Sequence, residues 1–66
     1  MLVHSDIPDW VIYLAQDADG QWWGYEAEPN LSHLSWYENE VGRIVKLGKT
    51  EADIHWQQSL TKVADR

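Results

Sequence analysis

The stretch that decides the fold is residues 9–28, DWVIYLAQDADGQWWGYEAE. Its two ends, residues 9–16 and 21–28, are rich in the aromatic and β-branched side chains that favour strands. Between them stands Asp17-Ala-Asp-Gly20, and an Asp-Gly pair between two such runs is a strong local signal for a hairpin turn. We therefore predict a β-hairpin with strands over residues 9–16 and 21–28.

The register of this hairpin determines which side chains share a face of the sheet. If Asp19-Gly20 forms a two-residue type I′ turn, the numbers of paired residues sum to 39. The inner face then carries Trp10, Ile12, Leu14, Trp23, Tyr25 and Ala27. The outer face carries Val11, Tyr13, Ala15, Trp22, Gly24, Glu26 and Glu28. A three-residue loop with a glycine bulge would change the sum to 38 and redistribute these residues. We prefer the first register because it separates apolar from acidic residues more cleanly.

Two alternatives stay open for residues 29–41. Leu31, Leu34 and Val41 loosely fit a helical spacing, with Asn30 as a cap and Gly42 as a stop. The pair Trp36-Tyr37 instead fits a short edge strand that precedes a turn at residues 38–40.

The second half of the chain predicts one more strand and one helix. Residues 42–47 contain the β-branched pair Ile44-Val45 and are bounded by Gly42 and Gly48, which favours a third strand. Thr50 and Asp53 form a variant of the capping box. After them, apolar residues recur at helical spacing at Ala52, Trp56, Leu60, Val63 and Ala64. We predict an α+β fold: a three-stranded antiparallel meander (9–16, 21–28, 42–47) with one face covered by a C-terminal helix over 51–64.

Length and cysteine content limit how this fold is stabilised. Sixty-six residues allow one small domain, spanning 1–66, whose poorly patterned residues 1–8 we expect to be poorly ordered. A chain of this size buries only about 60% of its unfolded surface. Because it has no cysteine for a disulfide, most of its five Trp and three Tyr residues must contribute to the core.

The charge distribution argues against some partners and favours others. Residues 1–42 contain eight acidic residues and no Lys or Arg, whereas residues 43–66 contain five basic and three acidic residues. The two parts thus carry −8 and +2, which sum to the net charge of −6. This balance argues against direct binding of nucleic acid, whose phosphates attract Lys and Arg. We also expect no secretory signal and no membrane span, and we take the cytoplasm as the default location.

No constellation in the sequence indicates catalysis or a bound metal. Asp17, Asp19, Gly20 and Glu26 match positions of a calcium loop, but Ala15 stands where the first ligand should be. The three histidines have no metal-ligand spacing, and the glycines are too scattered for a phosphate loop. Pairs of acidic residues two apart serve glycoside hydrolysis only in a deep cleft, which we do not expect in so short a chain. We therefore predict no enzyme, no metal site and no cofactor.

Several segments resemble the short orphan proteins that tailed bacteriophages and prophages carry. The resemblance rests on residues 17–26 (DADGQWWGYE), 36–37 (WY), 42–43 (GR), 47–49 (LGK) and 56–60 (WQQSL), and on a small, acidic, tryptophan-rich and cysteine-free composition. It implies an accessory protein that acts on a macromolecule of the host or the phage, in the host cytoplasm. It assigns a function to no residue.

These observations predict a non-enzymatic interaction protein. Its binding residues would be Tyr13, Trp22, Glu26 and Glu28, on the outer face of the acidic hairpin, and its partner a basic protein surface. The alternative is a structural module that forms a homodimer through the outer-face aromatics. Carbohydrate binding by stacked tryptophans is a third possibility.

Overall fold

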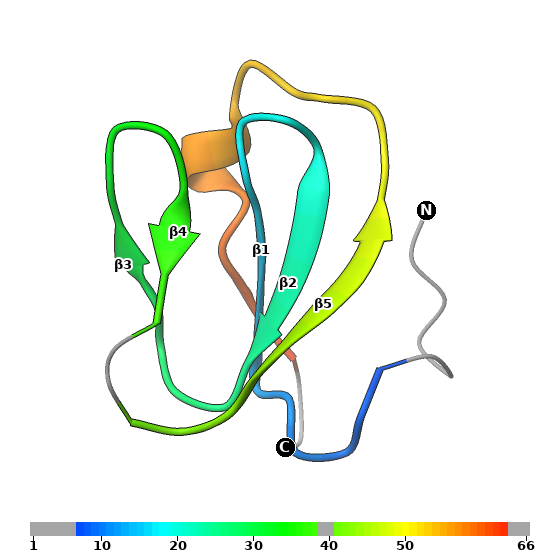
Figure 1. Cartoon of the computed structure of the whole chain (residues 1–66), viewed down its shortest axis with the longest axis vertical. Coiled ribbons are helices and arrows are strands. Elements are labelled where there is room, and N and C mark those ends of the chain that lie inside the picture. Colours follow the sequence, from blue (N-terminus) through cyan, green and yellow to red (C-terminus); the bar gives the residue numbers. More distant parts are fainter. Residues whose placement is uncertain (1–6, 39–40, 64–66) are drawn as a thin grey trace.

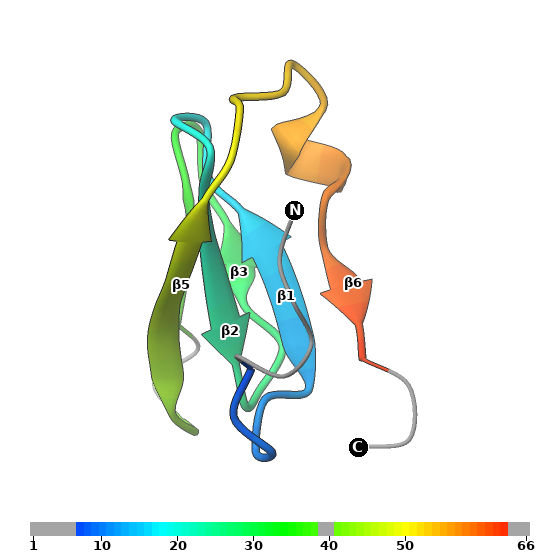
Figure 2. The same cartoon turned by 90° about the vertical axis from the view of Figure 1, so that its right-hand side faces the viewer.

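The computed structural model describes residues 7–38 and 41–63, which form six strands and one 3₁₀ turn. In chain order these are β1 (Tyr13–Gln16), β2 (Gln21–Tyr25), β3 (Asn30–Leu31), β4 (Trp36–Tyr37), β5 (Ile44–Lys49), the 3₁₀ turn η2 (Trp56–Gln58) and β6 (Thr61–Lys62). Four strands form an antiparallel sheet in the order β5-β2-β1-β6, seen from left to right in Figure 2. The two short strands β3 and β4 form a separate hairpin at one side of that sheet (Figure 1).

The predicted hairpin is confirmed, with strands that are shorter than the predicted 9–16 and 21–28. Its preferred register is wrong. Tyr13 lies opposite Tyr25, so the numbers of paired residues sum to 38. The connecting loop has three residues, 18–20, and the Asp17 N–H closes it by donating to the Gln21 carbonyl oxygen over 2.9 Å. The chain therefore adopts the bulged loop that was the alternative to a type I′ turn.

Contacts of Gly20 explain this choice of loop. Gly20 has a φ of 95°, a conformation that favours glycine, and its N–H donates to the Asp17 carbonyl oxygen over 3.0 Å. The Asp19 carboxylate accepts the next N–H, that of Gln21, at 3.0 Å. The Gly20 carbonyl oxygen accepts the N–H of Thr50 at 3.0 Å, and a Cβ on Gly20 would collide with the Thr50 carbonyl oxygen. The turn is thus fixed by the chain that follows β5.

This register separates residues that the type I′ register places together. Tyr13 and Tyr25 are directly opposed on one face, whereas Gln16 and Trp22 are directly opposed on the other. The prediction that Tyr13 and Trp22 share a face is therefore wrong, because a shift of one residue moves a strand's side chains to the opposite face.

The third strand predicted over residues 42–47 is found as β5, Ile44–Lys49, and it pairs with β2. Val45 lies opposite Gly24 and Lys46 opposite Trp23. The register shifts between Gln21 and Trp23, which marks a β-bulge at the end of β2 that is nearest the loop.

The predicted C-terminal helix over 51–64 is wrong, and the α+β fold class with it. In the described part of this segment, residues 51–63, the helical element is one 3₁₀ turn, Trp56–Gln58. The chain then becomes extended as β6, which pairs with the outer edge of β1 through Leu14 and Thr61. The described residues therefore form a mainly β fold with two sheets.

Polar contacts from elsewhere in the chain replace the expected helix cap. The Thr50 hydroxyl accepts hydrogen bonds from Gln16 Nε2 at 3.1 Å and from Trp22 Nε1 at 2.8 Å. The Asp53 carboxylate accepts the N–H of His55 at 2.8 Å, a local bond that competes with helix formation. A helix of this length is marginal without packing, so these contacts outweigh its propensity.

Apolar side chains form two clusters, one on each face of the four-stranded sheet. The Val11 cluster comprises buried Ile7, Val11 and Val63 with half-buried Trp10, Leu14, Val45 and Leu47. The Trp36 cluster comprises buried Ala15, Tyr25 and Trp36 with half-buried Tyr13, Trp23, Trp56 and Leu60. Both faces therefore carry a core, whereas the sequence predicts one covered face and one free face.

Residues 29–41 and the two ends of the chain carry the remaining predictions. Of the two alternatives for 29–41, the short strand at Trp36-Tyr37 is the one found, paired with Asn30–Leu31. The turn expected at 38–40 lies largely outside the described residues. So do residues 1–6 of the lead-in, for which the sequence predicts poor order, and Ala64 of the predicted helix. Ile7, which belongs to that lead-in, is buried.

Candidate functional site

Of the four predicted binding residues, Glu26 makes an internal ion pair. Its carboxylate accepts hydrogen bonds from Arg43 Nη2 at 3.0 Å, Nε at 3.2 Å and the backbone N–H at 2.9 Å. The Arg43 guanidinium also lies 4.7 Å from the centre of the Trp10 ring. Hydrogen bonds from the Arg43 side chain, and then from its backbone, hold the pKa of the Glu26 carboxyl below its usual value.

The other three predicted residues lie in three different environments. The Trp22 indole N–H donates to Thr50, and Tyr13 packs in the Trp36 cluster on the opposite face. Glu28 is exposed in the connection between β2 and β3. The structure therefore does not bring Tyr13, Trp22, Glu26 and Glu28 together as one surface.

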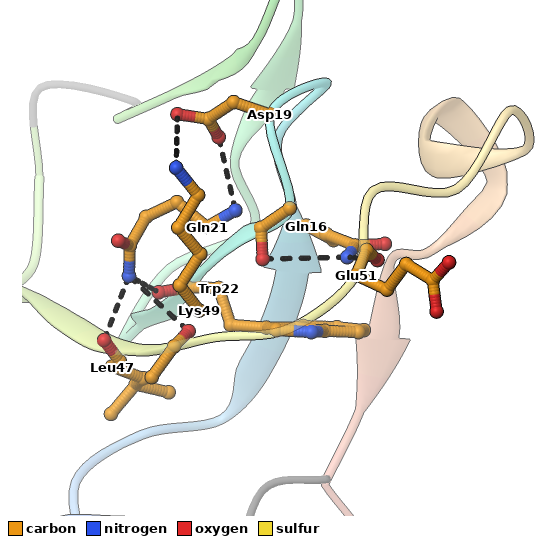
Figure 3. A network of polar contacts seen from close by, with 9 residues as sticks. Gln16, Asp19, Gln21, Trp22, Leu47, Lys49 and Glu51 are labelled. Atoms are coloured by element: carbon orange, nitrogen blue, oxygen red, sulfur yellow. Dashed lines mark hydrogen bonds and ion pairs between the residues drawn. The ribbon is translucent and has the colours of Figure 1, made fainter.

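The polar groups around Trp22 belong to a network at the end of the hairpin (Figure 3). Gln21 Nε2 donates to the Leu47 carbonyl oxygen over 2.7 Å, and Lys49 Nζ lies 3.9 Å from the Asp19 carboxylate. Gln16, which is 3% exposed, donates from Nε2 to Thr50 and to the Glu51 carbonyl oxygen, both over 3.1 Å. These groups join the hairpin to the end of β5 and to the residues that follow it.

A cleft of about 320 Å³ opens on the other face, between β4 and the strands β2 and β5. Four aromatic side chains line it: Trp23 and Tyr25 from β2, and Trp36 and Tyr37 from β4. Two carboxylates, Asp17 and Glu38, line it as well, together with Ser35 and Ile44. The cleft is therefore aromatic and acidic at once.

Buried residues fix the base of the cleft. Tyr25 is 2% exposed and Trp36 is 8% exposed. The Trp36 backbone N–H donates to the Asp17 carboxylate over 2.9 Å, and its indole N–H lies 3.4 Å from the Trp56 carbonyl oxygen. These bonds hold β4 against the hairpin loop and against η2.

The charges of the cleft act on the Tyr25 hydroxyl. Burial, followed by the negative charges of Asp17 and Glu38, raises the pKa of Tyr25 to about 12. Both carboxylates therefore disfavour a negative charge on this hydroxyl at the base of the cleft.

The basic side chains of the described residues do not neutralise these two carboxylates. Arg43 pairs with Glu26, and Lys49 pairs with Asp19. Lys46 and Lys62 are exposed and make no ion pair within residues 7–38 and 41–63. Lys46 lies opposite Trp23 in the sheet but does not line the cleft.

Sequence reasoning missed this cleft because it depends on contacts between distant segments. The sequence pattern indicates a turn residue at Asp17, and it predicts that Trp23 and Tyr25 lie on the inner face covered by a helix. The bulged-loop register puts both aromatics on the same face as Tyr13. A local signal existed only for the strand at Trp36-Tyr37, and nothing in the sequence places that strand over β2.

The described residues hold neither a cluster of metal ligands nor a helix that could cross a membrane. Across residues 7–38 and 41–63, no three His, Asp or Glu side chains gather in a way that would hold a metal ion. The helical segments of the same residues include none with the length and apolar character needed to cross a membrane.

Comparisons of the chain with models of protein families, with curated protein sequences and with solved structures find no match. What defines its class is therefore the structure itself: a small, mainly antiparallel β domain with an aromatic, acidic cleft on one face of its larger sheet.

Proposed function

We propose that this protein is a non-enzymatic binding protein that docks onto a basic surface of another macromolecule through the cleft between β4 and β2–β5. The single observation that carries this proposal is the composition of the cleft: four aromatic side chains and two carboxylates. Aromatic side chains dominate the energetics of protein interfaces, and complementary charge steers association.

The surroundings of the cleft support the same partner. Glu28 precedes β3 by two residues and Glu38 directly follows β4, so in this antiparallel pair both lie at the same end. Both are exposed and make no ion pair within the described residues. With a net charge of −6, the protein as a whole attracts basic surfaces.

This proposal keeps the partner predicted from the sequence and moves the contact surface. Glu28 remains beside the proposed surface, whereas Trp22 and Glu26 are engaged in internal bonds. An accessory role in a bacteriophage stays a prediction from the resemblance of the sequence.

The test is affinity capture from a bacterial lysate at low salt, followed by binding of the purified partner. We expect to capture a partner with a basic surface. Its affinity for this protein should fall as the salt concentration rises, because salt screens the attraction between the partner's basic side chains and Glu38. The variant Glu38→Gln should weaken binding. The matched control Glu51→Gln, which changes an exposed carboxylate away from the cleft, should bind as the wild type does.

Two results would overturn the proposal. One is equal binding of the partner by the wild type and by Glu38→Gln. The other is a homodimer in sedimentation that buries Leu31, Tyr37 and Ile44, which are between 40% and 51% exposed in the single chain. That result would support the structural module that the sequence offered as its alternative.

A further inference from the structure

We infer that the cleft holds one organic cation, the ammonium or guanidinium end group of a lysine or arginine side chain on the partner. The group would lie against the aromatic rings and between the carboxylates of Asp17 and Glu38. This inference rests on the proposed function and names the chemical group that the cleft recognises.

The cleft offers aromatic ring faces to a cation. The faces of Trp and Tyr carry a negative quadrupole that attracts a cation, and Trp attracts it best. Trp23 and Tyr37 belong to the partly exposed walls of the cleft, so their rings are accessible to a group from outside. The same chemistry already operates in this chain, where the Arg43 guanidinium lies 4.7 Å from the centre of the Trp10 ring.

The two carboxylates of the cleft have no basic partner among the described residues. Arg43 and Lys49 are paired with other carboxylates, and Lys46 and Lys62 do not reach Asp17 or Glu38 within ion-pair distance. The Tyr25 hydroxyl at the base stays neutral under the influence of both charges. A cation that enters would therefore gain attraction to two carboxylates, of which Asp17 already accepts the Trp36 backbone N–H, without displacing a basic side chain of the described residues.

The size of the cleft also fits one such group. About 320 Å³ lies at the lower end of the range for small-molecule sites, about 300–1,000 Å³. This volume suits the end of one side chain with part of its apolar stem, which would pack beside Ile44. A sugar ring would also stack on the aromatics, but it would leave the two negative charges uncompensated.

The test is an NMR titration of the full chain with n-butylammonium chloride and with ethylguanidinium chloride. Sodium chloride at the same concentration controls for ionic strength, and 1-butanol is the neutral probe of similar shape. The indole N–H signals of Trp23 and Trp36 should shift with both cations, whereas that of Trp22 on the opposite face should not. The neutral probe should bind more weakly than either cation.

Variants then identify the groups that act. Glu38→Gln and Tyr37→Leu should each lower the affinity for butylammonium about three- to fivefold. Both residues are exposed, so neither change should prevent folding. Glu51→Gln should leave the affinity unchanged. Equal binding of 1-butanol, shifts with methyl glucoside in place of the cations, or no loss of affinity in Glu38→Gln would each overturn the inference.

The design separates this inference from the proposed function. If neither cation binds but a captured basic protein still loses affinity for Glu38→Gln, the cation site is wrong and the docking function stands. If the cations bind as expected but no basic macromolecule is captured, the docking function is wrong and the cation site stands.

Discussion

At the scale of single residues, the Tyr25 hydroxyl links the cleft to the stability of the fold. Its pKa is raised from 10.0 to about 12, first by burial and then by Asp17 and Glu38. In the unfolded chain the same group titrates near its ordinary value of about 10. Between about pH 10 and 12 the folded state therefore keeps a proton that the unfolded state has lost, and the free energy of unfolding falls as the pH rises.

The variant Tyr25→Phe removes this titration. We expect its free energy of unfolding to decline less steeply than that of the wild type between about pH 10 and 12, because no phenol remains to be held neutral. Urea denaturation at several pH values measures the slope. Tyr37→Phe, which changes an exposed tyrosine, is the control. Parallel slopes for Tyr25→Phe and the wild type would contradict the assignment.

Gly20 is a second residue on which the fold depends. Its φ of 95° is strained for a residue with a side chain, and a Cβ there would meet the Thr50 carbonyl oxygen. We expect Gly20→Ala to lower the free energy of unfolding by about 1–3 kcal/mol. Gly48→Ala is the matched control, because Gly48 is exposed in β5 and has no positive φ. Similar urea midpoints for the two variants would show that the loop tolerates a side chain.

At the scale of elements, Gln16 joins the end of β1 to the segment that was expected to be a helix. Its Nε2 donates to the Thr50 hydroxyl and to the Glu51 carbonyl oxygen from a site that is 3% exposed. We expect Gln16→Ala to cost about 1–3 kcal/mol, since it removes these hydrogen bonds and leaves a cavity where the buried side chain was. Gln57→Ala, at an exposed position of η2, should change the urea midpoint little. A neutral effect of Gln16→Ala would mean that water replaces its bonds.

The same contacts explain which elements could be predicted from the sequence. The hairpin was predictable because its strands and its turn are encoded within twenty consecutive residues, 9–28. Its register was not, because the bulged loop depends on Thr50, thirty residues beyond Gly20. The C-terminal segment has a helical spacing of apolar residues, but its Thr50 cap is used by Gln16 and Trp22. The cleft depends likewise on a bond between Asp17 and Trp36.

At the scale of the whole molecule, one sheet supports both apolar clusters. Val11 is fully buried and packs directly on β2, where an added Cβ on Gly24 would lie 2.9 Å from its Cγ2. Tyr25, the next residue of β2, belongs to the Trp36 cluster on the opposite face. Because the two clusters share the backbone of β2, loss of either should unfold the other, and the domain should unfold in one cooperative transition.

The variant Val11→Ala tests this coupling. It removes buried methyl groups from the Val11 cluster and should lower the free energy of unfolding by about 1–3 kcal/mol. The indole N–H signal of Trp36, on the opposite face, should then disappear at the same reduced urea concentration as the far-ultraviolet circular dichroism of the sheet. Val41→Ala, which changes a side chain that is 63% exposed, should leave both midpoints in place. If the Trp36 signal keeps the wild-type midpoint while the Val11 cluster melts earlier, the two faces fold independently, and the cleft would survive damage to the opposite core.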